Sequence, residues 1–199
     1  MKFHNVLDEI LGNRTKVKLL RAFFTYLEKE FTESELQRIA GIPQASVHRN
    51  VKFLLANGLL DRERIGKANL YSLNKEHILY ALLQNIFENE KNLLSELKKS
   101  LKGSIESFSG IELAVLFGSV LKGTERADSD IDIFIVCKAD KSQVEEEMKN
   151  LIQVIGNKFG NPVSPMIKND TEMKDIRSSS IYKELKRGEV LFKREGFEW

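Results

Sequence analysis

Two apolar runs in the second half of the sequence restrict the fold more than any other feature. Residues 112–117 (Glu-Leu-Ala-Val-Leu-Phe) end in a Gly-Ser pair, and residues 130–136 (Asp-Ile-Asp-Ile-Phe-Ile-Val) begin with two acids. Short apolar runs bounded by turn residues favour strands. Side chains two apart share a face of a strand, so Asp130 and Asp132 project together while the isoleucines pack on the other face. We therefore expect a sheet that presents paired carboxylates.

These carboxylates predict a cation site. Two adjacent carboxylates repel each other unless a cation lies between them, and their oxygens suit Mg²⁺, which keeps part of its coordination for water and nucleotide phosphates. Gly118 lets the backbone approach a phosphate without a side-chain clash, and the amides and hydroxyl beside Ser119 can bind phosphate oxygens. The combination predicts a site for a metal-bound nucleoside triphosphate. The alternative is an edge strand whose aspartates only keep the sheet soluble.

The full motif is Phe117-Gly118-Ser119-x3-Gly123-x5-Ser129-Asp130-x-Asp132. It resembles the DNA polymerase β-type nucleotidyltransferase superfamily, in its minimal nucleotidyltransferase branch, over about residues 104–193. The resemblance implies a mixed sheet with helices, a Gly-Ser turn that grips the triphosphate and paired acids that hold metal. It thus implies that Gly118, Ser119 and Ser129 bind nucleotide, and that Asp130 and Asp132 are catalytic and bind Mg²⁺.

One acid that the resemblance implies is missing. Active members of the superfamily carry a third carboxylate on the next strand, which this sequence places near residues 163–168, after a helix over residues 141–159. Ser164 or a neighbour stands there instead, and Asp170 or Glu172 in the following loop is another source of the acid. Loss of this carboxylate can leave nucleotide binding intact while it slows transfer.

The last segment is expected to be structural, with a helix over residues 176–186 and a short strand over residues 190–193.

The two halves of the chain also differ in charge. Residues 1–102 contain 17 Lys and Arg against 12 Asp and Glu, and residues 103–199 contain 14 against 17. A Gly- and Ser-containing stretch follows a long helical pattern at this division. We expect three parts, which are residues 1–76, a connecting helix over residues 77–103, and residues 104–199.

The first part is expected to contain three helices and a hairpin. Helical spacing covers residues 15–28, a capped short helix closes at Gly41, and a third helix begins near Pro43 and ends at Asn57-Gly58. Two alternating segments around a Gly-Lys turn follow and predict a hairpin. This order, with the turn sequence Gly-Ile-Pro-Gln-Ala-Ser-Val, resembles winged helix-turn-helix transcriptional regulators over about residues 10–75.

The third helix is expected to present a basic outer face. No Asp or Glu occurs between Leu36 and Leu60, as a helix that enters a groove lined with phosphates requires. We expect contacts to double-stranded DNA from the helix and from the hairpin. The alternative is a winged helix used for protein contacts or dimerisation. The expected DNA contacts are Gln44, Ser46, His48, Arg49 and Lys52 on the helix, and Arg62, Arg64 and Lys67 on the hairpin.

The long helical pattern over residues 77–102 needs a surface to cover its apolar stripe. Packing against the same helix of a second chain would make a homodimer, as palindromic DNA sites favour, and burial within the chain is the alternative. No run approaches the roughly 18 apolar residues that span a membrane, so no membrane partner is expected. The single cysteine, Cys137, fits a reducing cytoplasm.

Two functions follow from this α+β chain. The first is a DNA-binding transcriptional regulator whose nucleotidyltransferase-like domain binds a Mg²⁺-nucleotide or a partner protein. The second is an active transferase that moves a nucleotidyl group from a nucleoside triphosphate to a hydroxyl of a protein or small molecule. This second function is similar to that of minimal nucleotidyltransferases that act as antitoxins.

Overall fold

The computed structural model describes residues 5–138 and 141–199. Residues 1–4, part of the expected first region, lie outside this description. The chain divides into two compact units, Met1–Lys91 and Asn92–Trp199, and each is described by itself. Within the described residues, no helix is both long and apolar enough to cross a membrane.

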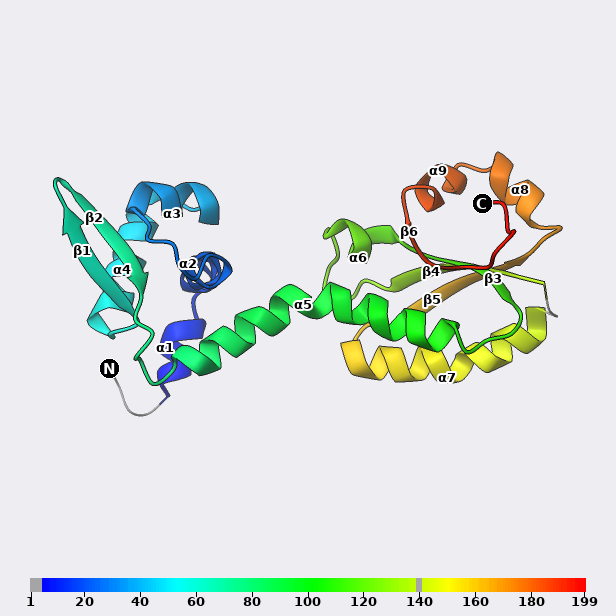
Figure 1. The fold of residues 1–199 in the computed structure, drawn as a ribbon, viewed down its shortest axis with the longest axis horizontal. Helices are drawn as coiled ribbons and strands as arrows, with labels where there is room; N and C mark the ends of the chain where they lie inside the picture. Colours follow the sequence, from blue (N-terminus) through cyan, green and yellow to red (C-terminus); the bar gives the residue numbers. More distant parts are fainter. Residues whose placement is uncertain (1–4, 139–140) are drawn as a thin grey trace. The chain divides into compact units, whose positions relative to one another are not determined.

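Unit 1 has the expected order of helices followed by a hairpin (Figure 1). Side chains set the helix ends: Asn13 accepts hydrogen bonds from the amides of the first turn of α2, and Thr32 forms a capping box with Glu35 at the start of α3. The fold expected for this region is therefore confirmed, with one helix, α1, that the sequence did not predict. The elements are α1 (Val6–Leu11), α2 (Arg14–Thr25), α3 (Glu33–Ala40), α4 (Gln44–Ala56), β1 (Leu60–Ile65) and β2 (Ala68–Leu73).

The long helix α5 (Tyr80–Ile105) begins in unit 1 and ends in unit 2. Its Leu83 and Phe87 belong to the core of unit 1, and Leu97 and Leu101 belong to a core of unit 2. Part of the apolar stripe predicted over residues 77–102 is therefore buried within the chain. The helix begins at Tyr80 rather than at residue 77, since residues 77–79 form a turn.

Unit 2 is a four-stranded mixed sheet in the order β5-β4-β3-β6. Strand β3 pairs antiparallel with both β4 and β6, and β4 pairs parallel with β5 through the crossover helix α7. Because β4 is an inner strand, the edge-strand interpretation of its aspartates is wrong. The elements are β3 (Ile111–Phe117), α6 (Gly118–Lys122), β4 (Ile131–Cys137), α7 (Lys141–Phe159), β5 (Val163–Asn169), α8 (Met173–Ser178), α9 (Ile181–Leu185) and β6 (Glu189–Lys193).

The two faces of this sheet are covered by different elements (Figure 1). Helix α7 and the end of α5 pack on one face, around Ile131, Ile133 and Ile135. Helices α8 and α9 and the C-terminal residues cover the other face, where Trp199 stacks on Phe134 with 5.9 Å between ring centroids. Since side chains alternate along a strand, Asp132 lies on this second face, at the end where β4 begins.

The single helix predicted over residues 176–186 is wrong, because the structure has two short helices there. The break falls at the serines between them. Ser178 and Ser179 donate their hydroxyls to the carbonyls of Asp175 and Ile176, and Ser179 adopts an extended backbone at φ −86°, ψ 160°. Local bonds of this kind compete with helix continuation. The break turns α9 into a separate element next to β3.

Candidate functional site

The Gly-Ser turn and the paired aspartates come together at one end of the sheet. Phe117, the last residue of β3, is in register with Asp132, and Gly118 follows with φ +80°. A Cβ on Gly118 would lie 2.0 Å from Oδ2 of Asp132. The carboxylate of Asp132 therefore lies directly against the turn, in space that only glycine leaves open. The structure brings these two predicted residues into contact.

Burial and neighbouring charges act on Asp132. Its pKa is raised, first by burial and then by the negative charges of Asp130 and Glu184, while the nearby ammonium of Lys122 opposes the rise. Asp130 itself is exposed and lies directly before the first residue of β4, near enough to Asp132 for its charge to act on that carboxylate. The site thus concentrates negative charge at a partly buried carboxylate.

This chemistry fits a divalent cation. Carboxylate oxygens are ligands that Mg²⁺ prefers, and the charged form of one of these two carboxylates is destabilised by its neighbours. A bound Mg²⁺ would neutralise this negative charge. Asp130 and Asp132 are the residues that would hold it. Within residues 5–138 and 141–199, no group of three or more His, Cys, Asp or Glu is arranged to hold a metal ion by itself. Mg²⁺ commonly completes its coordination with water and with phosphate oxygens.

The predicted serines have different positions in this region. Ser119 is half-buried in the first turn of α6, directly after Gly118. Ser129 is occupied within its own loop, since its Oγ accepts a hydrogen bond from the amide of Arg126 at 2.8 Å. Its carbonyl also accepts from Nδ2 of Asn161, at 2.8 Å. Ser129 thus holds the loop that leads into the paired aspartates.

No acid stands beside Asp132 on β5. In the parallel register, Ser164 is the partner of Asp132 and shares its face of the sheet. Glu172 lies at the other end of the strand, where it accepts from the amide of Asn169 and pairs with Lys168. The expectation that Asp170 or Glu172 replaces the missing acid is therefore wrong, because a strand of this length separates them from Asp132.

Two charged residues near this site were not expected from the sequence. Lys122 ends α6, and its Nζ pairs with Glu184 of α9, a helix from the segment that was expected to be only structural. Lys122 stands directly before the second glycine of the motif, at a position that the motif leaves unspecified. No signal in the sequence pointed to Glu184, since it comes from 62 residues further along the chain.

In unit 1, the predicted DNA-contacting residues of α4 lie mostly on one open face. Gln44, His48, Arg49 and Lys52 are exposed, whereas Ser46 is half-buried and its carbonyl accepts from the buried Asn50 at 2.7 Å. The helix contains no Asp or Glu. However, the structure adds an acid from α3: Glu33 contacts Nδ1 of His48 at 3.1 Å and accepts from Nε2 of Gln44 at 3.4 Å.

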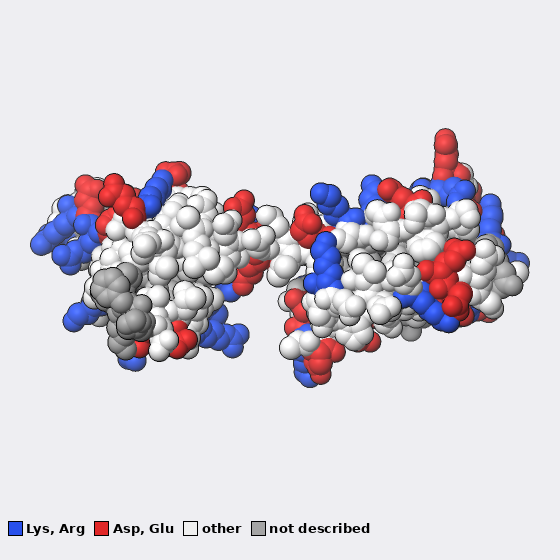
Figure 2. Space-filling view, turned by 90° about the horizontal axis from the view of Figure 1, so that it is seen from below, with Lys and Arg blue, Asp and Glu red and all other residues white. Residues whose placement is uncertain are grey.

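The hairpin separates its charges by face. Arg62, Arg64 and Lys67 are all exposed, and Arg62 is in register with Tyr71, whose hydroxyl donates to Glu33 at 3.1 Å. Residues in register share a face, so the two arginines lie on the side of the sheet that faces Glu33, opposite to Asp61 and Glu63. Figure 2 shows basic and acidic side chains gathered at the end of unit 1 that carries this hairpin.

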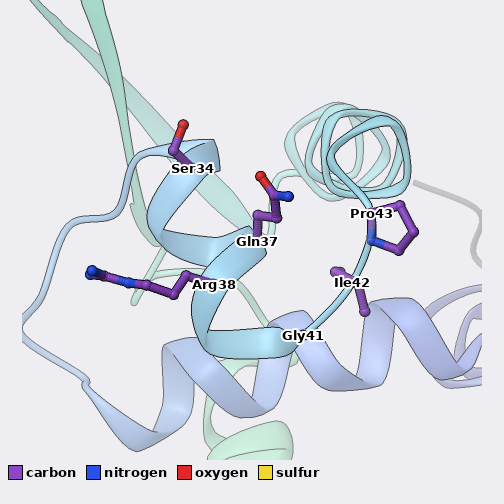
Figure 3. A pocket seen from close by; sticks show the side chains of 6 residues that line it. All are labelled: Ser34, Gln37, Arg38, Gly41, Ile42 and Pro43. Atoms are coloured by element: carbon purple, nitrogen blue, oxygen red, sulfur yellow. The ribbon is translucent and has the colours of Figure 1, made fainter.

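An open groove lies beside the turn between α3 and α4 (Figure 3). Gln37 points toward the side of α4, and Arg38 points away from it. The groove therefore adds polar groups next to the start of α4. The residues that line it are Ser34, Gln37, Arg38, Gly41, Ile42 and Pro43.

Comparisons with known proteins match both halves of the chain. Residues 99–196 match the family model described as "Polymerase beta, Nucleotidyltransferase". No curated protein matches the chain. Among solved structures, the chain is similar to a predicted DNA-binding transcriptional regulator from E. coli, with 20% identity over 44% of this chain and 85% of that one, and a TM-score of 0.36.

Two further solved structures show comparable similarity. The transcriptional repressor BigR from Xylella fastidiosa is 21% identical over 44% of this chain and 81% of its own, with a TM-score of 0.36. The archaeal chromatin protein TrmBL2 is 19% identical over 92% of this chain and 76% of its own, with a TM-score of 0.31. Unit 1 thus has the element order of a winged helix-turn-helix, and residues 99–196 are similar to the polymerase β nucleotidyltransferase family.

Proposed function

We propose that the protein is a DNA-binding transcriptional regulator whose nucleotidyltransferase domain binds a nucleoside triphosphate together with Mg²⁺. The observation that carries DNA binding is the exposed, acid-free face of α4 beside the basic face of the hairpin. Lys and Arg on such surfaces neutralise phosphates and supply affinity, and polar side chains that reach base edges supply specificity. Arg49 and Lys52 on α4, with Arg62 and Arg64 on β1, serve the first role.

The nucleotide site is supported by the contact between Gly118 and Asp132. Mg²⁺ at Asp130 and Asp132 would neutralise their charge and hold triphosphate oxygens. Gly118 leaves the turn open to phosphate, and Ser119 offers a hydroxyl beside it. Lys122 lies near enough to lower the pKa of Asp132, so its ammonium is available to a phosphate once Glu184 releases it.

A homodimer in the cytoplasm belongs to the same proposal. Leu82 and Ile86, four residues apart on α5, are 46% and 40% exposed, and Ile78 in the turn before the helix is 81% exposed. Exposed apolar stripes of this kind are typical of protein contacts. A second copy of the chain would cover them with an identical stripe, as in a two-fold dimer on a palindromic site. The buried free thiol of Cys137 fits a reducing compartment.

Nucleotidyl transfer to a hydroxyl is the second candidate function. It is favoured by Glu184, which brings a third negative charge to Asp132 although β5 has none to offer. In such a transfer the acceptor oxygen bonds to the α-phosphorus, pyrophosphate leaves, and a carboxylate takes the hydroxyl proton.

The regulator proposal is tested by separating the two sites. Arg49→Ala should weaken binding to duplex DNA roughly fivefold or more, because it removes a helix contact, whereas Asp132→Ala should leave DNA binding unchanged. Arg187→Ala, which removes an exposed arginine of unit 2, is the matched control. Fluorescence anisotropy with the duplex that the wild-type protein enriches from a randomised pool measures this. Equal losses in Arg49→Ala and Asp132→Ala would contradict the division of roles.

The nucleotide proposal is tested with labelled ATP and CTP in the presence and absence of Mg²⁺. Equilibrium binding should require Mg²⁺ and should be lost in Asp132→Ala but kept in Asp175→Ala, an exposed acid of α8. Incubation with cell extract then distinguishes the two functions. Label transferred covalently to an acceptor, and absent with Asp132→Ala, would establish the transferase, whereas binding without transfer supports the regulator.

A further inference from the structure

We propose that Glu33 is a positioning residue for DNA recognition, whose carboxylate sets the orientation of Gln44 and His48 on the surface that meets the bases. The inference rests on the proposed DNA binding by unit 1. It adds to that interface an acid from α3, outside the acid-free stretch of α4.

Two local structures hold Glu33 in place. The chain enters α3 through a bridge between Phe31 and Tyr71, with both backbone hydrogen bonds at 2.9 Å. Thr32 then caps the helix, with Glu35 bonding back to the amide of Thr32 at 2.9 Å. Glu33 follows as the first residue of the helix, directly after the capping residue and two residues after the bridge to the hairpin. Its side chain is 20% exposed, so it is largely screened from water.

The carboxylate of Glu33 contacts side chains from two other elements. The hydroxyl of Tyr71 donates to Oε1 at 3.1 Å, and Nε2 of Gln44 donates to Oε2 at 3.4 Å. Nδ1 of His48 lies 3.1 Å from Oε1 and 3.3 Å from Oε2. An ionised carboxylate only accepts hydrogen bonds, so each of these three partners must be the donor. The geometry therefore assigns a hydrogen to Nδ1 of His48.

In the neutral ring, this assignment determines what His48 offers to DNA. With the hydrogen on Nδ1, the neutral imidazole keeps Nε2 as an acceptor, and the ring is 68% exposed. In the major groove an acceptor pairs with the amino groups of adenine or cytosine and not with the acceptor edge of guanine. Without Glu33 the ring can take either tautomer and rotate. Glu33 also places a negative charge near the phosphates, which lowers affinity for any duplex. Its role is therefore discrimination between sequences rather than affinity.

Binding to two duplexes measures that discrimination in the full chain. The first is the duplex that wild type enriches from a randomised pool, and the second is a shuffled duplex of the same composition. Glu33→Gln should tighten binding to the shuffled duplex two- to threefold and lower the ratio of the two affinities about fivefold to tenfold. Glu63→Gln on β1 removes the same charge from the exposed acidic face of the hairpin. It should leave the ratio unchanged.

The ring nitrogens of His48 give a second readout that needs no DNA. Nitrogen NMR at about pH 8 distinguishes the two neutral tautomers. Wild type should show the Nδ1–H form, and Glu33→Gln should shift toward a mixture. The sequence has three histidines, so His48→Ala identifies the signal. Tyr71→Phe, which removes one donor to Glu33 without a change in charge, should give an intermediate shift.

The outcomes separate this inference from the proposed function. If wild type enriches no duplex, the proposed DNA binding is wrong. The NMR experiment still tests whether Glu33 sets the tautomer of His48, because it needs no DNA. If wild type discriminates but Glu33→Gln keeps the same ratio, or if His48 of wild type carries its hydrogen on Nε2, Glu33 has no positioning role. A lower ratio in Glu33→Gln alone, together with the tautomer shift, supports it.

Discussion

The contact between Gly118 and Asp132 makes one glycine necessary for the candidate nucleotide site. Gly118→Ala would force a Cβ to within 2.0 Å of the Asp132 carboxylate and would also strain a backbone at φ +80°. We expect it to displace the carboxylate, to abolish Mg²⁺-dependent nucleotide binding and to lower the free energy of unfolding by about 1–3 kcal/mol. Urea unfolding and nucleotide titration measure the two effects.

Gly123→Ala provides the matched control for this substitution. Gly123 has a similar backbone, at φ +67°, but no atom lies within 4 Å of the position that a Cβ would take there. It should lose stability through backbone strain while it keeps nucleotide binding. If both variants lose binding equally, strain in the loop and not the Asp132 contact explains the effect.

Asp132 should also reduce the stability of the protein at neutral pH. Its folded-state pKa is raised, so the folded state holds the proton more tightly than the unfolded chain. The resulting stabilisation is complete below the unfolded pKa and is lost as pH rises through the folded pKa. Asp132→Asn cannot ionise and should therefore have a higher urea midpoint than wild type at pH 7, with a difference that shrinks toward low pH. A lower midpoint at pH 7 would contradict this electrostatic account.

The capping box that begins α3 gives the opposite pH dependence. The backbone amide of Thr32, followed by the ammonium of Lys29, lowers the pKa of Glu35 below its usual 4.5. A lowered pKa contributes stability that is present above the unfolded value and is lost as pH falls through the folded value. Glu35→Gln should therefore destabilise the protein at pH 7 and lose that effect in acid. Glu30→Gln, at an exposed position, is the control in the same urea titrations.

Helix boundaries illustrate how far local patterns reach in this chain. Thr32, Gly41 and the apolar spacing of α4 predict the helix-turn-helix because caps and turns act within a few residues. The apolar spacing over residues 176–186 is also helical and predicts one helix there. The serines of this segment bond to nearby carbonyls instead, and this competition with the backbone is not visible in a count of apolar residues.

The molecule as a whole should associate through α5. Leu82→Glu combined with Ile86→Glu places charges on the exposed stripe, so we expect the sedimenting mass to fall from two chains to one and DNA affinity to fall with it. Val154→Glu, at an apolar position of α7 that is 54% exposed, should leave the mass unchanged. Analytical ultracentrifugation measures the mass of wild type and of both variants. A wild-type protein that sediments as one chain would exclude the dimer.

The amino-acid sequence alone predicted the helix-turn-helix and hairpin of unit 1, the difference in charge between the two halves, and the strand that carries Asp132. These features depend on periodicity, caps and turns, which act between residues close in the chain. Only the tertiary structure decided which distant charges meet. Glu33 reaches His48 because a bridge to β2 anchors the start of α3, and Glu184 reaches Lys122 and acts on Asp132 because α9 folds back over the sheet. Contacts of this kind depend on how elements pack. The sequence around Glu33 and around Glu184 contains no local pattern that predicts the partner of either residue.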